Sequence, residues 1–298
     1  MLTAVKLFRS YEEQLDLLES RGMDVGDRDA ALSQLQRVNY YRLSGYWYPF
    51  RKLVAGVRVD EFYAGTTLSD VVKLYEFDAS LRAMTFSSLA TIELVMRALL
   101  GHELGRIHEC VHLEPSLLNA RTRGEPYRLW RQKYERSLAE SHEDFVGHHR
   151  NLYGGRLPIW AAVELLDWGG LTKLYGFSPR PVQDAVAECF RLRAPQLESW
   201  LKSLNIVRNV CAHHGRLFNR VFALSPRLPS PGRYPALDSA APFSKIFGHL
   251  TLIQFMLDSQ GLRRAGLPAA MRAFPEVRIV PVGHTGAPDS WSESPLWS

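Results

Sequence analysis

Cysteine is scarce in this sequence, and the residues present form no framework. The 298 residues include only three cysteines, Cys110, Cys189 and Cys211, which lie far apart and form no C-x-x-C pair. An odd number of scattered cysteines argues against a set of structural disulfides and favours a reducing compartment. We therefore expect an intracellular protein.

Long apolar segments are lacking as well. No run approaches the roughly 20 residues that cross a bilayer, and the opening residues, MLTAVKLFRSYEEQ, lack the apolar centre of a secretory signal. These absences predict a cytoplasmic protein that does not use a membrane.

Charge of one sign dominates only weakly. There are 36 Lys and Arg residues against 31 Asp and Glu, giving a net charge of +5. This balance permits a polyanionic partner without requiring one. Hydrophobic residues make up 46% of the chain, which excludes global disorder and allows a large core.

What the sequence has in abundance is helical periodicity. Apolar residues recur at spacings of three and four from Leu74 to Leu99, which predicts a long helix beginning near Thr67. We expect an all-α fold with three parts. They are an N-terminal helical and aromatic segment (1–66) with a small hairpin or loop at 52–66, a main helical domain (67–263), and an irregular tail (264–298) that is mobile at its end.

Shorter helices are expected on either side of the long one. Capping signals, prolines and glycines mark their ends. The expected helices run from Ser10 to before Gly22, around 32–38, over 127–138, from Pro158 to a stop at Gly169-Gly170, from Pro181 through Phe190, from Pro195 to about His214, and around 246–257.

The segment APQLESWLKSLNIVRNVCAHHGRLFNR holds the most informative pattern. Its apolar residues fall on one stripe of a helix, and Arg208 lies in the middle of that stripe. A guanidinium there needs a carboxylate or an anion as its partner. The stripe consists of Leu197, Trp200, Leu201, Leu204, Val207 and Cys211.

Two polar residues accompany this arginine near the end of the helix, where Gly215 is the expected stop. Asn209 and His213 are four residues apart and share a flank of the helix. Histidine is the side chain best suited to proton transfer near neutral pH. Arg216 and Arg220 follow and are candidates for binding flanking phosphates.

These residue types suit RNA cleavage without a metal. A base takes the proton of a 2′-OH, which only RNA has, and the oxygen attacks the adjacent phosphate. An acid protonates the departing oxygen, and a cation stabilises the phosphate charge. Because one histidine cannot serve both ends at once, we expect a homodimer that brings two copies of His213 to one scissile bond.

The R-N-x-x-A-H-H motif resembles the R-x4–6-H motif of HEPN ribonucleases, as Arg208-x4-His213. Over residues 10–260 the chain also resembles the Abi (abortive infection) family, of the AbiD/AbiF type. Four blocks in order carry this resemblance: YYRLSGYWYPF (Tyr40–Phe50), LYEFDASLRAMTFSSLATIELVMR (Leu74–Arg97), LPIWAAVELLDWGGLTKLY (Leu157–Tyr175) and RNVCAHHGRLFNR (Arg208–Arg220).

The resemblance implies a HEPN-like helical bundle and a role in phage defence, as an RNase toxin of a toxin–antitoxin-like system with an RNA or protein antitoxin. It implies that Arg208 and His213 are catalytic and that Asn209 supports them, with no cofactor. The family's acidic position falls on Glu164, which we expect to orient Arg208, and His214 is a further supporting residue.

Other interpretations remain open. The motif residues can be a buried ion pair and a helix cap, or the domain can be a non-catalytic HEPN-like module that binds RNA. A distant third is a zinc hydrolase, because His108 and His112 match H-E-x-x-H. The aromatic residues of Tyr40–Phe50 can stack on bases, although packing against the bundle is the interpretation we favour.

Overall fold

The computed structural model describes residues 5–263 and 265–298, and the chain there is mainly α-helical. The sheet among these residues is the expected hairpin, in which β1 (Arg51–Val54) pairs antiparallel with β2 (Val57–Phe62). The all-α class is therefore confirmed. The α-helices are α1 (Tyr11–Ser20), α2 (Arg28–Arg37), α3 (Tyr40–Trp47), α4 (Leu68–Gly105), α5 (Glu125–Glu140), α6 (Asp144–Leu152), α7 (Ile159–Ala162), α8 (Trp168–Phe177), α9 (Arg180–Cys189), α10 (Ala194–Ala212), α11 (Pro235–Asp238), α12 (Ile246–Ser259) and α13 (Gly266–Arg272).

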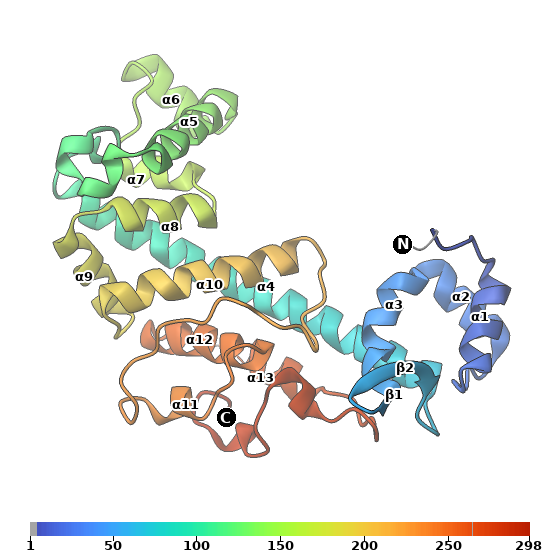
Figure 1. Ribbon diagram of the computed structural model, residues 1–298. Coiled ribbons are helices and arrows are strands. Elements are labelled where there is room, and N and C mark those ends of the chain that lie inside the picture. Colours follow the sequence, from blue (N-terminus) through green and yellow to red (C-terminus); the bar gives the residue numbers. More distant parts are fainter. Residues whose placement is uncertain (1–4, 264) are drawn as a thin grey trace.

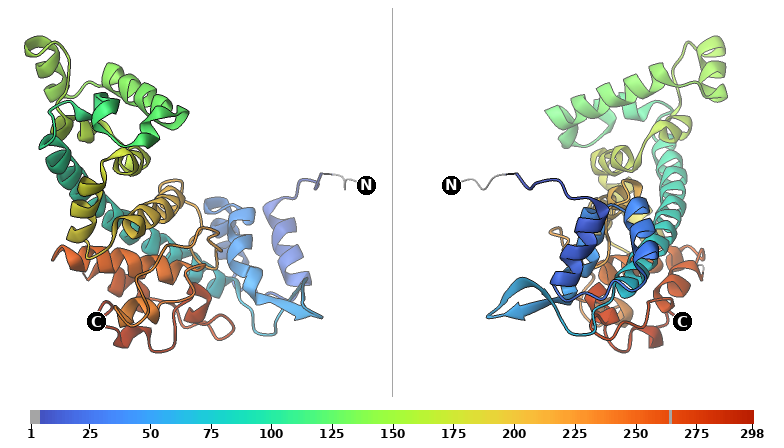
Figure 2. Two further views of the ribbon diagram at one scale, coloured as in Figure 1. Left: turned by 60° about the vertical axis from the view of Figure 1, so that its left-hand side comes forward. Right: turned by 90° about the vertical axis from the view of Figure 1, so that its right-hand side faces the viewer.

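The long helix α4 is the element around which the others are arranged (Figure 1). Thr67 caps its N-terminus by accepting the N–H of Asp70 at 3.0 Å, so the helix begins where the sequence predicts. Helices α3, α7, α8, α9, α10, α12 and α13 contact it. Figures 1 and 2 place α1–α3 and the hairpin toward one end of α4 and α5 and α6 toward the other.

The composition of α4 corrects the expectation that no segment is long and apolar enough to cross a membrane. An 18-residue window of this helix has a mean hydropathy of 1.4. The helix nevertheless carries a charged pair, Glu93 and Arg97, whose side chains lie 2.8 Å apart. It contacts seven other α-helices, although only 28% of that window is buried.

Two hydrophobic cores form along α4. The smaller one joins the N-terminal helices to the first turns of α4, through Leu68, Val71 and Leu74. The larger one takes in the rest of α4 from Phe77 onward, together with the helices from α5 to α13. The largest buried side chains of the smaller core are Tyr46, Trp47 and Phe50 from the Tyr40–Phe50 block, so these three aromatic rings serve packing.

The pair Gly169-Gly170 does not stop a helix, contrary to expectation. Only one turn, α7, follows Pro158, and a 3-10 turn and an extended Leu166 come next. Asp167 then caps α8, and its carboxylate accepts the N–H of Gly170 at 2.7 Å. The two glycines thus lie in the first turn of a new helix, because an aspartate N-cap outweighs their low helix propensity.

The C-terminal segment is more ordered than expected. Residues 266–272 form α13, which packs on α4. Trp297 is only 1% exposed, stacks on Phe247 with ring centroids 4.9 Å apart, and donates from its indole N–H to Thr251. After α13 the segment is irregular, as expected, with two short 3-10 turns and no further α-helix or strand in residues 273–298. The sequence did not predict α13, nor that Leu296 and Trp297 near the end of the segment belong to the larger core.

Candidate functional site

Helix α10 carries the R-N-x-x-x-H motif and has the predicted apolar face. It runs from Ala194 to Ala212, with Pro195 in its first turn. All six residues of the predicted stripe are buried. Arg208 lies among them but is only half-buried, so its guanidinium reaches the rim of the core and not its centre.

Arg208 is not closed off by an ion pair. Its guanidinium lies over the ring of Phe86 on α4, 5.6 Å from the ring centroid. Its Nε is buried and hydrogen-bonds to none of the described residues, and no carboxylate in residues 5–263 or 265–298 lies within ion-pair distance of it. A half-buried cation of this kind is free to accept an anion.

Beside Arg208 lies a hollow of about 290 Å³, which we call the lysine–arginine pocket. Helices α5, α8 and α10 supply its walls, and three of its side chains are cations. Its lining consists of Trp130, Lys133, Asp167, Trp168, Gly169, Gly170, Lys173, Asn205, Arg208 and Asn209.

Two buried indoles hold the walls of this pocket together. Trp130 on α5 donates from its ring N–H to the carbonyl of Gly170 on α8 at 3.0 Å. Trp168 on α8 donates in the same way to the carbonyl of Leu201 on α10 at 2.8 Å. Each hydrogen bond is buried and joins two different helices, so the pocket is a preformed feature of the fold.

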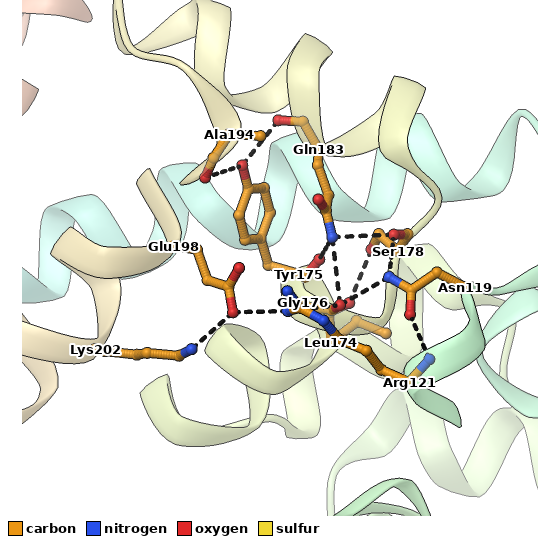
Figure 3. Close-up of polar contacts among 10 residues, drawn as sticks. All are labelled: Asn119, Arg121, Leu174, Tyr175, Gly176, Ser178, Gln183, Ala194, Glu198 and Lys202. Atoms are coloured by element: carbon orange, nitrogen blue, oxygen red, sulfur yellow. Dashed lines mark hydrogen bonds and ion pairs between the residues drawn. The ribbon is translucent and has the colours of Figure 1, made fainter. Parts of the chain in front are cut away.

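The far end of α8 is anchored by side chains that satisfy its last carbonyls (Figure 3). Asn119, Gln183 and Arg121 all donate to the carbonyl of Gly176, at 2.8, 3.3 and 3.4 Å. Arg121 also pairs with Glu198 of α10 at 2.8 Å. Helix α8 is thus fixed at both ends, which sets the position of the pocket residues it carries.

Asp167 is the one carboxylate among the pocket residues. It accepts from the Lys133 ammonium at 2.6 Å while it caps α8. Burial acts to raise its pKa, but the hydrogen bonds from Lys133 and the Gly170 N–H and the charges of Lys133 and Arg208 outweigh burial, so its pKa lies below the ordinary value. Asp167 is therefore an anion, and its ion pair with Lys133 offsets the charge of that lysine.

The end of α10 differs in detail from the expected glycine stop. His213 is the C-cap residue, and its N–H donates to the carbonyl of Asn209 at 3.0 Å. His214, and not Gly215, takes the left-handed conformation, with φ of 53°. Gly215 makes a close approach instead, because a Cβ there would lie 3.0 Å from Val210 Cγ1 and 3.2 Å from the Val210 carbonyl oxygen. The side chains of Asn209, His213 and His214 are all exposed.

The segment after α10 is tied to α3, within the aromatic block Tyr40–Phe50. Arg42 donates to the carbonyl of His214 at 2.6 Å, and Arg216 donates to the carbonyl of Gly45 at 2.7 Å. A Cβ on Gly45 would lie 3.0 Å from Arg216 Nε, so a larger residue there would press on the Arg216 side chain. The aromatic block therefore helps to position the catalytic candidates.

A buried carboxylate completes this attachment. Asp78 of α4 is fully buried and accepts the backbone N–H of Phe218 at 2.7 Å and that of Leu217 at 3.2 Å. It also accepts the hydroxyl of Tyr46 at 2.6 Å and forms an ion pair with Arg82. Five groups from three parts of the chain thus meet at the segment that follows the motif.

The remaining candidates from the sequence lie outside the pocket. Glu164 pairs with Arg97 at 3.1 Å, and among the described residues nothing joins it to Arg208. The expected orienting contact is thus replaced by an ion pair with α4. Arg216 is half-buried in its contact with α3, whereas Arg220 is exposed beside the ring of Phe222. The predicted contacts of Arg216 and Arg220 with RNA stay predictions.

The H-E-x-x-H match does not have the geometry that a zinc site requires. Helix α4 ends at Gly105, so His108 and His112 do not share a helix face. His112 is fully buried, packs edge-on against Tyr134, and neither ring nitrogen hydrogen-bonds to a described residue. No group of three possible ligand residues lies together in residues 5–263 and 265–298. The structure thus gives the zinc-hydrolase alternative no support.

Several pocket residues were missed by sequence reasoning. Asn205 precedes Arg208 and Asn209 by three and four positions, a spacing that places all three on one side of α10 and could have revealed it. Lys173 is on α8 and Lys133 on α5, and no local pattern links them to the motif.

A second hollow, of about 570 Å³, is lined by Glu140, Glu143 and Glu164 beside Arg97, and its acidic side chains make it a poor site for a phosphate.

The chain matches the family described as Abi-like protein over residues 33–219, which is more than half of its length. The protein therefore belongs to the Abi-like protein family. The matched region holds all four sequence blocks except Arg220, and it contains the lysine–arginine pocket. Membership of this family points to a role in abortive infection, a form of defence against phage. No curated protein and no solved structure matches the chain significantly.

Proposed function

We propose that this protein is a metal-independent endoribonuclease and acts as the toxin of an abortive-infection system. The observation that carries the proposal is the state of Arg208. Its guanidinium borders a cationic pocket without an ion-pair partner among the described residues, on the helix that also presents the exposed Asn209 and His213.

In the proposed reaction, His213 accepts the proton of a ribose 2′-OH. The 2′ oxygen then bonds to the adjacent phosphorus, and the bond from phosphorus to the 5′ oxygen breaks. A second imidazole gives its proton to that departing oxygen. Arg208 stabilises the extra negative charge on the phosphate oxygens, and Asn209 orients His213 or the phosphate. The products are a 2′,3′-cyclic phosphate and a 5′-hydroxyl.

The second imidazole comes from a second copy of the chain in this proposal. Lys202, Ile206, Asn209 and His213 are all exposed and follow one another on α10 at spacings of four, three and four. Such a stripe can pair with itself across a two-fold axis. It includes an apolar side chain, Ile206, that is 39% exposed. A self-pairing of this kind would bring two motifs together.

The test is cleavage of RNA by the purified full-length protein. We expect cutting that resists EDTA, leaves cyclic phosphate ends and fails on a substrate with a 2′-deoxyribose at the cut. His213→Ala should lower the rate at least about 100-fold, the usual contribution of a general acid or base. The matched control is His142→Ala, an exposed histidine outside α10. Equal cleavage by His213→Ala and the unmodified protein would refute the proposal.

Two further outcomes test the shared dimeric site and the catalytic role separately. An Ile206→Glu protein should sediment as a monomer and lose cleavage, and a fully active monomer would rule out a shared site. RNA binding without cleavage, retained by His213→Ala, would instead identify a non-catalytic RNA-binding module. The pocket gives that alternative some support, because its cations do not depend on His213. In either case, an RNA or protein antitoxin would act by covering the lysine–arginine pocket and the exposed side of α10.

A further inference from the structure

The lysine–arginine pocket has the charge and shape of a phosphate site that extends beyond the motif. Lys133, Lys173 and Arg208 face it against the single carboxylate of Asp167. Lys133 and Lys173 are exposed, so their ammonium groups can reach a ligand without unfolding anything. Its volume of about 290 Å³ is close to the lower end of the range for ligand pockets, about 300–1,000 Å³, which suits a small group such as a phosphate.

Hydrogen bonds hold the helices that form the walls of the pocket, whereas its two lysines are exposed at the surface. The indole hydrogen bonds of Trp130 and Trp168 join α5, α8 and α10, and the lysines project from that frame on flexible side chains. Lysine is a point charge that binds a phosphate from many directions, and such contacts read no base. The arrangement therefore suits a backbone phosphate more than a specific base.

We propose that the pocket binds a backbone phosphate of the RNA next to the one that is cut, with Lys133 and Lys173 as its principal cations. This inference rests on the proposed ribonuclease function. Asp167 acts against binding, because its charge repels the phosphate and its contact with Lys133 at 2.6 Å must open before RNA can use that lysine. The bound strand thus displaces a carboxylate from an ammonium group.

Two substitutions in this pocket should change RNA affinity in opposite directions. Lys173→Gln removes a cation and should weaken binding. Asp167→Asn removes the competing charge, yet its amide oxygen can still cap α8, since asparagine is as good an N-cap as aspartate. Asp167→Asn should therefore bind RNA more tightly, an effect that mere damage to the fold would not produce.

The experiment measures binding of a short single-stranded RNA by fluorescence anisotropy at several salt concentrations, in a His213→Ala background that prevents cutting. For each of Lys133→Gln and Lys173→Gln, the slope of log affinity against log salt should fall in magnitude by about 0.7. The control is Lys52→Gln, an exposed lysine on the distant hairpin, which should leave the slope unchanged. Competition with a free mononucleotide tests whether an unattached phosphate occupies the same pocket.

Each outcome decides something. If Lys133→Gln, Lys173→Gln and Asp167→Asn all bind RNA as their parent does, while His213 is needed for cleavage, the pocket inference is wrong and the ribonuclease proposal stands. If a mononucleotide binds and Lys173→Gln weakens its affinity while leaving RNA affinity unchanged, the pocket holds a free nucleotide and the inference about the RNA strand is wrong. If the unmodified protein neither binds nor cuts RNA, both proposals fail.

Discussion

The hydroxyl of Tyr46 offers a direct test of how the catalytic candidates are held. In Tyr46→Phe the ring stays buried in its edge-on contact with Tyr75, but the hydroxyl's hydrogen bond to Asp78 at 2.6 Å and the one it accepts from Arg82 at 3.3 Å are lost. Burial raises the pKa of Asp78, and its hydrogen bonds and the charge of Arg82 oppose that rise. Burial and the neighbouring Asp78 raise the pKa of the Tyr46 phenol above its ordinary value. The hydroxyl is therefore protonated at every relevant pH and always acts as the donor.

The magnitude follows from the type of hydrogen bond. A bond to a charged group contributes about 1.5–3 kcal/mol to the free energy of unfolding, whereas a neutral one contributes about 1 kcal/mol. Tyr175 provides the matched control, because it is equally buried and its hydroxyl donates only to the backbone carbonyls of Gln183 and Ala194. Tyr46→Phe should therefore lose about twice as much stability as Tyr175→Phe.

The assay is urea unfolding followed by circular dichroism, with RNA cleavage measured in parallel. Tyr46→Phe should also lower cleavage, because Asp78 binds the backbone of Leu217 and Phe218 just after the motif. Tyr175→Phe should leave cleavage nearly unchanged. If the two variants lose equal stability, Asp78 is not held as a charged acceptor, and the account of how the motif is positioned must be discarded.

Two further predictions concern a glycine and a histidine. Gly45→Ala should destabilise the protein, because the new Cβ would lie 3.0 Å from Arg216 Nε, whereas Gly147→Ala, in a helix where nothing lies within 4 Å, should stabilise it by about 0.5–1 kcal/mol. Thermal unfolding compares the two, and equal effects would contradict the close approach. Burial lowers the pKa of His112 to about 3, so below pH 6.5 the unfolded chain binds a proton that the folded chain does not. Stability should then fall by about 1.4 kcal/mol for each pH unit as the pH drops. His112→Phe should flatten that dependence in unfolding curves at pH 4.5–6.5, and an unchanged slope would show that the imidazole is accessible when folded.

Much of the fold could be predicted because local signals agreed with it. Thr67 caps α4 where the apolar periodicity begins, and the apolar stripe of α10 is buried as expected. The errors have tertiary causes. Gly169-Gly170 enters a helix because Asp167 caps it. The burial of Trp297 against Phe247 was not predicted, because these residues are too far apart for any local pattern to show their contact.

The candidate site was only partly predictable for the same reason. Arg208 and Asn209 lie on α10 and His213 caps its end, so the sequence alone could assign all three to one element. Of the three, only Arg208 and Asn209 line the pocket. Lys133 reaches the pocket only because the indole of Trp130 fixes α5 to α8, a contact across 40 positions of sequence.

The sharing of α4 by both hydrophobic cores limits how the protein can be divided for study. A fragment that ends at residue 66 would lose Leu68, Val71 and Leu74, which complete its interior. A fragment that begins there would leave Phe218 and Val280 without the side chains that cover them. Neither piece should fold when expressed alone, and the two should regain structure only when mixed. The sharing of α4 therefore predicts that the protein unfolds as a single cooperative unit, despite its two separate interiors.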